Sequence, residues 1–442
     1  MVATTPRNPT NPKNPDESPV LRTSRRQFLQ RSALLAGTVS ALPQLSFGQS
    51  GPAANGQRFA DSSSSDYWQS VRDQFAFSEN TVPMNAANLC PSFKTVADTV
   101  AELTADIDND CSFNNRAKYS DMLEQTRSLV AEQLHVSSDE IALVRNTSEA
   151  NNIINNGLQL DGGDEVIIWN QNHPTNHVAW EVRAARFGTR VRKVATPASP
   201  TDPQQLIDTF VDAFGPRTRV LALTQVSNVS GIKLPVKEII AAAHARGIYV
   251  HVDGAQSWGA MALDLADLGA DSFTASAHKW YMGPKEVGLL YVRSENIPRI
   301  WPGVIAPGWG NDVEADPVGA RKFESLGQRD DAALAALGLT AQLHNEIGPA
   351  RVEARITELA QHLKEGIAAQ GLQLVTPMSP ALSHGVCITR APSGQGSSIS
   401  GRLYSEHGIA GAATGGVRLC PTIYNTTAHI DRAITGLGAL MT

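Results

Sequence analysis

An aspartate and a lysine stand at the ends of two successive apolar runs, and together they could hold an aldehyde cofactor. Asp253 follows the run IYVHV, whose β-branched residues predict a buried strand. Lys279 follows a second short run, DSFTASAH, after a segment long enough for one crossover between parallel neighbours. Side chains just past the carboxyl ends of such strands face the ligand crevice of an open α/β sheet. There a lysine can form a Schiff base and an aspartate can keep a pyridinium nitrogen protonated, so the pair indicates pyridoxal phosphate.

Each residue alone has a simpler interpretation. A lone aspartate after a strand is usually a turn residue or a helix cap. A lone lysine is usually a solvated surface charge. The order of Asp253 and Lys279, and the motifs around them, favour the cofactor interpretation.

The surrounding motifs resemble those of the class V aminotransferase family, which includes cysteine desulfurases and isopenicillin-N epimerase-like proteins. The similarity runs from about Asn85 to the end of the chain and rests on LVRNTSEANNIINNGL, NQNHPTNHVAW, SNVSGIKLPVKEI, VDGAQ, ASAHKWYMGPKEVGLLYVR and VRLCPTIYNTTAHID. The resemblance implies an α/β protein of pyridoxal phosphate fold type I. That fold has a large domain with a mostly parallel sheet flanked by helices and a smaller C-terminal α/β domain. It also implies a homodimer.

The phosphate of such a cofactor needs an anion site. Thr147 and Ser148 open a predicted helix just past the strand IALVR, where free N–H groups and the helix dipole attract anions. Asn146 is expected to cap this helix, although simple capping would use the same residues. The resemblance implies that Ser276 and His278 bind the phosphate as well.

The resemblance also assigns residues to the cofactor ring and to the substrate. It places His173 against the pyridine ring, where it could relay protons, and Asn228 and Gln256 near the ring hydroxyl. It places Arg418 where the family holds the substrate's α-carboxylate, a group that the planar fork of arginine can bind through two hydrogen bonds. A surface histidine, a turn asparagine, a helix-start glutamine and a sheet-edge arginine are the simpler alternatives. His177, one helical turn after His173, is a second candidate histidine.

Three positions depart from the family pattern, and the first of them limits the reactions to be expected. The stretch LYSEHGIAGAATGGVR before Arg418 lacks the nucleophilic cysteine of desulfurases, which disfavours a persulfide route. A Gly-Thr pair that reaches the partner subunit's phosphate is here Gly327-Gln328, which leaves that contact open. Asn172 replaces the usual acidic residue before His173.

The domain organisation is predicted as four segments. The paired Arg25 and Arg26, followed by SALLAGTVSALPQL, resemble a twin-arginine signal peptide over residues 1–48, which predicts export of the folded protein to the periplasm. A flexible linker is expected at 49–65, a large cofactor-binding domain at 66–325 and a small domain at 326–442.

Composition excludes several other classes. With a net charge of −6 and a pI near 6.0, the chain is not expected to bind nucleic acid. No apolar run is long enough for a membrane span, and no metal motif occurs. Cys90, Cys111, Cys387 and Cys420 could form disulfides in several pairings or stay as free thiols. No G-x-G-x-x-G turn supports a nicotinamide dehydrogenase.

We therefore expect an exported, dimeric, pyridoxal-phosphate-dependent enzyme that acts at the α-carbon of an amino acid or of an amino-acid unit in a secreted metabolite, such as a siderophore. Aminotransfer, epimerisation and lyase chemistry share a first step, so transferase, isomerase and lyase stay open. The alternatives are a C–S lyase or desulfurase-like enzyme and a non-catalytic binding protein with the same fold.

Overall fold

The computed structural model describes residues 58–305 and 316–441. The predicted export signal at 1–48 lies outside these residues, as does much of the predicted linker at 49–65. The predicted division into a large and a small domain near residue 325 stays a prediction. No helix among the described residues is both long enough and apolar enough to cross a membrane.

A seven-stranded sheet forms the larger part of the structure, with the strand order β2-β8-β7-β6-β5-β3-β4. All neighbouring strands run parallel except β8, which is antiparallel to both β7 and β2. The expected mostly parallel sheet is therefore confirmed, and β6 and β7 are parallel neighbours as the spacing predicted. The strands are β2 (Ile141–Val144), β3 (Glu165–Trp169), β4 (Arg190–Val194), β5 (Thr218–Thr224), β6 (Tyr249–Asp253), β7 (Ser272–Ser276) and β8 (Gly288–Val292).

Helices cover both faces of this sheet, which explains why its strands are almost continuously apolar. Successive side chains of a strand point to opposite faces, so Ile167 and Trp169 of β3 join one core while Val166 and Ile168 join the other. The first core includes α5 (Lys118–Gln133), α8 (Pro203–Val211), α9 (Val236–His244) and α11 (Asp331–Ile347). The second includes α6 (Thr147–Gly157) and α7 (Pro174–Phe187).

The opening helix is shorter than its pattern predicted. The sequence from 66 to 77 indicates one amphipathic helix, but α2 ends at Arg72 (Tyr67–Arg72). Phe75 then packs at 4.6 Å between ring centroids from Phe93 and at 5.1 Å from Tyr424. These tertiary aromatic contacts end the helix before its local pattern does.

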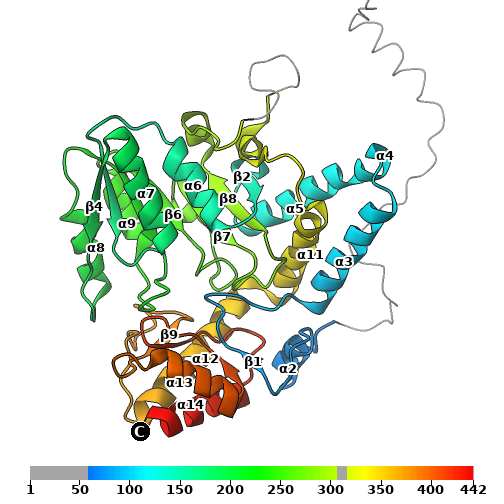
Figure 1. Ribbon diagram of the computed structural model, residues 1–442, viewed down its shortest axis with the longest axis vertical. Helices are drawn as coiled ribbons and strands as arrows, with labels where there is room; N and C mark the ends of the chain where they lie inside the picture. Colours follow the sequence, from blue (N-terminus) through cyan, green and yellow to red (C-terminus); the bar gives the residue numbers. More distant parts are fainter. Residues whose placement is uncertain (1–57, 306–315, 442) are drawn as a thin grey trace, which may run out of the picture. The chain divides into compact units, whose positions relative to one another are not determined.

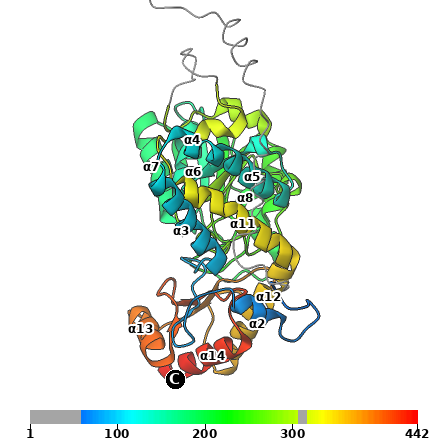
Figure 2. The same ribbon diagram turned by 90° about the vertical axis from the view of Figure 1, so that its right-hand side faces the viewer.

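The C-terminal part has its own apolar core. The runs HGVCITR and GGVRLCP predict strands, and within them β9 (Cys387–Thr389) pairs antiparallel with β11 (Val417–Leu419). The N-terminal segment joins this core, because β1 (Val82–Pro83) pairs in parallel with β10 (Ile409–Ala410). Figures 1 and 2 show the surrounding helices α12 (Pro349–Ala369), α13 (Gly396–His407) and α14 (Thr427–Met441).

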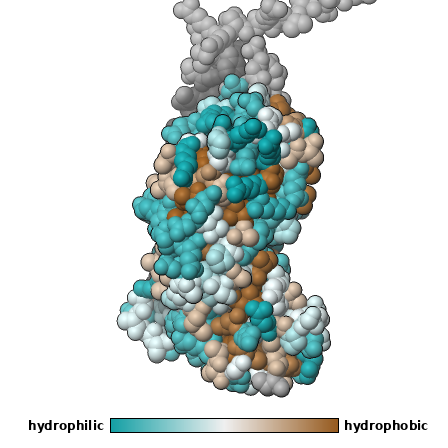
Figure 3. Space-filling view, turned by 90° about the vertical axis from the view of Figure 1, so that its left-hand side faces the viewer, coloured by the Kyte–Doolittle hydropathy of each residue, from teal (hydrophilic) through white to brown (hydrophobic). Residues whose placement is uncertain are grey.

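The remaining helices are short or lie at the surface. They are α3 (Lys94–Asn109), α4 (Phe113–Arg116), α10 (Leu265–Leu268) and the 3-10 turns η1 (Ser138–Glu140), η2 (Ser294–Arg299) and η3 (Gly319–Glu324). In Figure 2, α3, α5 and α11 run side by side across the large part of the molecule. Figure 3 shows another face, where hydrophilic residues predominate in the upper part and hydrophobic residues form narrower patches between them.

Candidate active site

Asp253 and Lys279 line one cavity of about 280 Å³. Asp253 is the last residue of β6, and Lys279 follows shortly after the end of β7, the next strand in the sheet. Both groups therefore lie beyond the carboxyl ends of parallel strands, where open α/β sheets bind ligands.

Two neighbours hold the carboxylate of Asp253. Its Oδ1 accepts a 3.0 Å hydrogen bond from the backbone N–H of Ala255. Its Oδ2 accepts a 3.0 Å hydrogen bond from the side-chain amide of Asn151 on α6. Asp253 is only 1% exposed, so its orientation is set by the protein and not by bulk water.

The amine of Lys279 has no hydrogen-bond partner among the residues that the structure describes. Burial lowers the pKa of Lys279, the nearby charge of Arg418 lowers it further, and Asp253 opposes both effects. An unpaired amine with a lowered pKa is more often neutral, and the neutral amine is the nucleophile that adds to an aldehyde.

The predicted phosphate residues meet at the start of α6. Asn146 caps this helix as expected, because its side chain accepts a 3.0 Å hydrogen bond from the N–H of Glu149. Thr147 and Ser148 follow it and line the cavity together with Ser276 and His278. Burial lowers the pKa of His278 to about 4, so this ring is neutral near pH 7 and can accept as well as donate.

His173 caps α7 and lines the same cavity. Partial burial lowers its pKa, and the charge of Lys279 adds to the effect. Asn172, which departs from the family pattern, is buried. Its side-chain amide donates to Ala222 O and accepts from the N–H of Thr224, both in the backbone of β5. These hydrogen bonds fix the loop that contains His173 against β5. The alternative, His177, is not among the cavity-lining residues.

Gln256 and Asn228 also line the cavity, but they differ in how free their side chains are. The amide of Gln256 donates to Ala87 O at 3.1 Å and accepts from Trp280 Nε1 at 2.8 Å. Its contacts therefore tie the end of β6 to two other segments. Asn228 contributes its backbone oxygen to Arg418, which leaves its side chain as the freer amide of the two.

Arg418 is brought close to the site without lining the cavity. It lies on β11 and is 4% exposed. Its guanidinium donates to Asn228 O at 2.9 Å and to Asn85 Oδ1 at 3.0 Å. Its Nε is buried and has no hydrogen-bond partner within residues 58–305 and 316–441. Its charge acts on both His173 and Lys279.

None of the four cysteines is among the described residues that line the cavity, and all four are free thiols. Cys90, Cys387 and Cys420 are buried, and burial raises the pKa of Cys90 and of Cys387 to about 12. Gln328, whose contact with a partner subunit was left open, accepts a 2.7 Å hydrogen bond from Arg116 of the same chain. No cluster of potential metal ligands occurs among the described residues.

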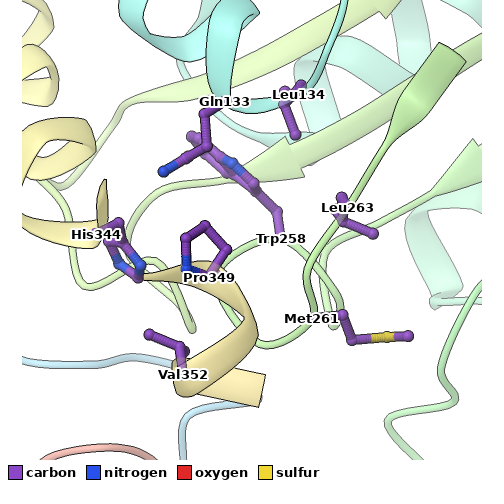
Figure 4. A pocket seen from close by; sticks show the side chains of 9 residues that line it. Gln133, Leu134, Trp258, Met261, Leu263, His344, Pro349 and Val352 are labelled. Carbon is purple, nitrogen blue, oxygen red and sulfur yellow. The ribbon is translucent and has the colours of Figure 1, made fainter. Parts of the chain in front are cut away.

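A second, much smaller cavity of about 20 Å³ lies away from these residues (Figure 4). Trp258, His344 and Pro349 border it. Tyr281 stacks between Trp258 and His344, with ring centroids 3.8 Å and 4.3 Å away. The space is sufficient for about one water molecule. It is a packing gap between α5, α11, α12 and the segment that follows β6, and it is too small for a substrate.

A class V aminotransferase family model matches residues 93–431. The chain belongs to this family. It is 28% identical over 390 residues to isopenicillin N epimerase of Streptomyces clavuligerus, covering 84% of this chain and 98% of the relative. It is 31% identical over 311 residues to a probable cysteine desulfurase of Methanothermobacter thermautotrophicus, covering 68% of this chain and 76% of the relative. A solved structure of C-DES with glycine covalently linked to its PLP cofactor has a TM-score of 0.76 at 23% identity, covering 83% and 98% of the two chains.

The fold is therefore pyridoxal phosphate fold type I, and the enzyme's cofactor is pyridoxal phosphate. The residues of this chain fit that cofactor. The amine of Lys279, the buried carboxylate of Asp253 and a helix N-terminus lined with hydroxyls surround one polar cavity. These three groups match an aldehyde, a pyridine nitrogen and a phosphate.

Several lining residues were not found from the sequence. Asn88, Thr175, Thr224 and Ala255 also border the cavity. Asn88 belongs to the N-terminal segment, far from the other motifs in sequence, and carried no signal. Thr224 ends β5 just as Asp253 ends β6, so the strand-end rule that found Asp253 could have found it.

Proposed function

We propose that this enzyme catalyses a reaction at the α-carbon of an amino acid, with isomerisation or aminotransfer favoured over desulfuration. The observation that carries the proposal is the single cavity that Asp253, Lys279 and the start of α6 share, with no cysteine among its described lining residues. The similarity to isopenicillin N epimerase over most of both chains supports it.

Each residue has a proposed task. Bound pyridoxal phosphate supplies an aldehyde that links to an amine and a ring that withdraws electrons from the α-carbon. Lys279 holds the cofactor through its amine and then moves protons at the α-carbon, which its lowered pKa favours. Asp253 keeps the ring nitrogen protonated, and His173 lies against the ring. Thr147, Ser148, Ser276 and His278 bind the phosphate, Asn228 and Gln256 contact the ring hydroxyl, and Arg418 holds the substrate carboxylate.

A second candidate is cleavage of a C–S bond, which the cysteine desulfurase relative favours. The buried thiols with raised pKa values argue against a persulfide on the protein itself. The relatives lend no support to the siderophore hypothesis, so the proposal names only an amino-acid-like substrate.

Incubation of holoenzyme with amino acids in deuterated water tests the main proposal. Proton NMR should show loss of the α-proton signal for the accepted substrate, and chiral chromatography or keto-acid detection should then separate isomerisation from aminotransfer. Lys279→Ala is the matched control and should show no exchange. If sulfide or another β-elimination product forms, and the recovered substrate has not exchanged its α-proton for deuterium, cleavage of a C–S bond is favoured instead.

Export and dimer formation are parts of the same proposal. Replacing Arg25 and Arg26 together by lysine should hold the precursor in the cytoplasm, because twin-arginine recognition discriminates against lysine. Processed protein reaching the periplasm at an unchanged rate would refute that route. Light scattering of the purified protein should give twice the chain mass, and a monomer that is fully active would refute the dimer.

A further inference from the structure

A chain of buried polar side chains lies behind Asp253. Asn151 of α6 donates from Nδ2 to Oδ2 of Asp253 at 3.0 Å. The Oδ1 of the same amide lies 2.8 Å from Nε2 of His251 and 3.0 Å from Oγ1 of Thr274. His251 Nδ1 lies 2.7 Å from Oγ of Ser272. Because all four side chains behind Asp253 are 0% exposed, they depend on one another for hydrogen bonds.

The carboxylate fixes the direction of every bond in this chain. A carboxylate only accepts, so Asn151 turns its NH₂ group toward Asp253 and its carbonyl oxygen toward His251. A carbonyl oxygen also only accepts, so Nε2 of His251 carries the proton. Burial lowers the pKa of His251 to about 3, so the ring is neutral and Nδ1 accepts from the hydroxyl of Ser272. Each N–H and O–H therefore points toward Asp253.

Donors aligned in this way act on the carboxylate together. Each hydrogen bond polarises the next, which strengthens the last one, from Asn151 to Asp253. Hydrogen bonds donated to a carboxylate stabilise its charged form. With the Ala255 amide on the other oxygen, the network also fixes the plane of the group.

Packing alone does not account for these residue types. His251 lies in the middle of β6 between Val250 and Val252, and both of these valines are 0% exposed. An apolar side chain would fill such a position without the cost of burying polar atoms. These polar side chains form a continuous chain of hydrogen bonds that ends on Asp253, which indicates that they act on its carboxylate.

We infer that Asn151 and His251 are positioning residues that keep the Asp253 carboxylate ionised and fixed in orientation, so that the ring nitrogen of bound pyridoxal phosphate stays protonated. The inference rests on the role proposed for Asp253. It goes beyond that role by assigning the protonation state of the cofactor to residues that do not line the cavity.

The test is the ¹⁵N resonance of the ring nitrogen after reconstitution with ¹⁵N-labelled pyridoxal phosphate near neutral pH. Asn151→Leu and His251→Leu should move this resonance from the protonated toward the unprotonated position. They should also weaken cofactor binding by roughly 10-fold, the scale set by losing a hydrogen bond to a charged group. His251→Gln keeps an N–H donor near the position of Nε2 and should retain the wild-type resonance. Asn156→Leu changes an exposed asparagine on the same helix and is the matched control.

The outcomes separate this inference from the proposed function. A wild-type resonance in folded Asn151→Leu and His251→Leu, even with a lower melting temperature, would overturn the inference and leave only a structural role. If Asn151→Leu does not fold, the contrast between His251→Leu and His251→Gln decides. An Asp253→Ala variant with the wild-type resonance would instead show that the role of Asp253 is wrong.

Discussion

Thr147 and Ser276 join the start of α6 to the end of β7 through two contacts. The N–H of Thr147 donates to Oγ of Ser276 at 2.8 Å, and the two hydroxyl oxygens lie 2.7 Å apart. Two segments far apart in the sequence thus meet at a helix N-terminus, where N–H groups and the helix dipole attract an anion. This relationship places hydroxyls from both segments at the proposed phosphate site.

Ser276→Ala should weaken binding of pyridoxal phosphate by about 10-fold or more, because a hydrogen bond to a charged group contributes about 1.5–3 kcal/mol. Titration of apoenzyme with the cofactor, followed by tryptophan fluorescence, measures the change. Ser128→Ala removes an exposed hydroxyl on α5 and should leave the affinity as it is. Equal affinities of the Ser276 and Ser128 variants would exclude Ser276 from the phosphate site.

The sequence was sufficient to predict Asp253 and Lys279 because each follows a short apolar strand whose end faces the crevice. It was not sufficient for Asn151, which reads as an ordinary helix residue until β6 and β7 bring Asp253, His251 and Thr274 against it. Partners of this kind depend on tertiary contacts that no local pattern encodes.

The same limit applies to side chains whose type was informative. Gln256 matched a ring-contact position, yet its amide bonds Ala87 and Trp280, which come from two other segments. The early end of α2 likewise follows from the packing of Phe75 on Phe93 and not from its own helical pattern. The antiparallel direction of β8 also came only from the structure.

Arg418→Lys should raise KM for the amino-acid substrate by about 10-fold or more, because lysine keeps the charge and loses the fork that binds a carboxylate twice. The cofactor's absorbance spectrum should stay as in the wild type. Stability should fall as well, by about 1–3 kcal/mol, since the bonds to Asn228 and Asn85 weaken.

Asn85→Ala separates the role of Arg418 in substrate binding from its role in stability. It removes one acceptor of the guanidinium and should lower the free energy of unfolding with a much smaller change in KM. If both variants keep the wild-type KM, Arg418 is structural and the carboxylate is held elsewhere.

The enzyme should release negligible sulfide when the amino acid cysteine is supplied as substrate. No described residue that lines the cavity is a cysteine, and the protein's buried thiols have raised pKa values. A methylene blue assay with a reductant measures the release. Cys111→Ser changes the one exposed cysteine and should not alter this background. Robust turnover that disappears on replacing any one of the cysteines would restore the persulfide route.

Buried His344 should make the protein less stable in mild acid. Burial lowers its pKa to about 4 against an ordinary value near 6.5, so the unfolded chain binds a proton that the folded one does not. The contribution of His344 to the free energy of unfolding is therefore complete above about pH 6.5 and is lost as the pH falls toward 4. The slope from this residue is at most about 1.4 kcal/mol per pH unit.

Urea unfolding at several pH values measures this dependence. His344→Gln should flatten the slope between about pH 6.5 and pH 4, whereas His362→Gln, at an exposed position of α12, should preserve it. Equal slopes in wild type and His344→Gln would contradict the assignment.

Lys279 is the residue that we expect to hold pyridoxal phosphate. Borohydride reduction of the holoenzyme makes the link between cofactor and lysine permanent, and peptide mapping by mass spectrometry then locates it. We expect an adduct on Lys279 that persists in Lys285→Ala. Lys285 is the next lysine in the sequence, and its Nζ donates to Ser92 at 2.9 Å. Lys279→Ala should give no adduct at this site, and an adduct on Lys285 or any other lysine of the wild-type enzyme would contradict the assignment of Lys279.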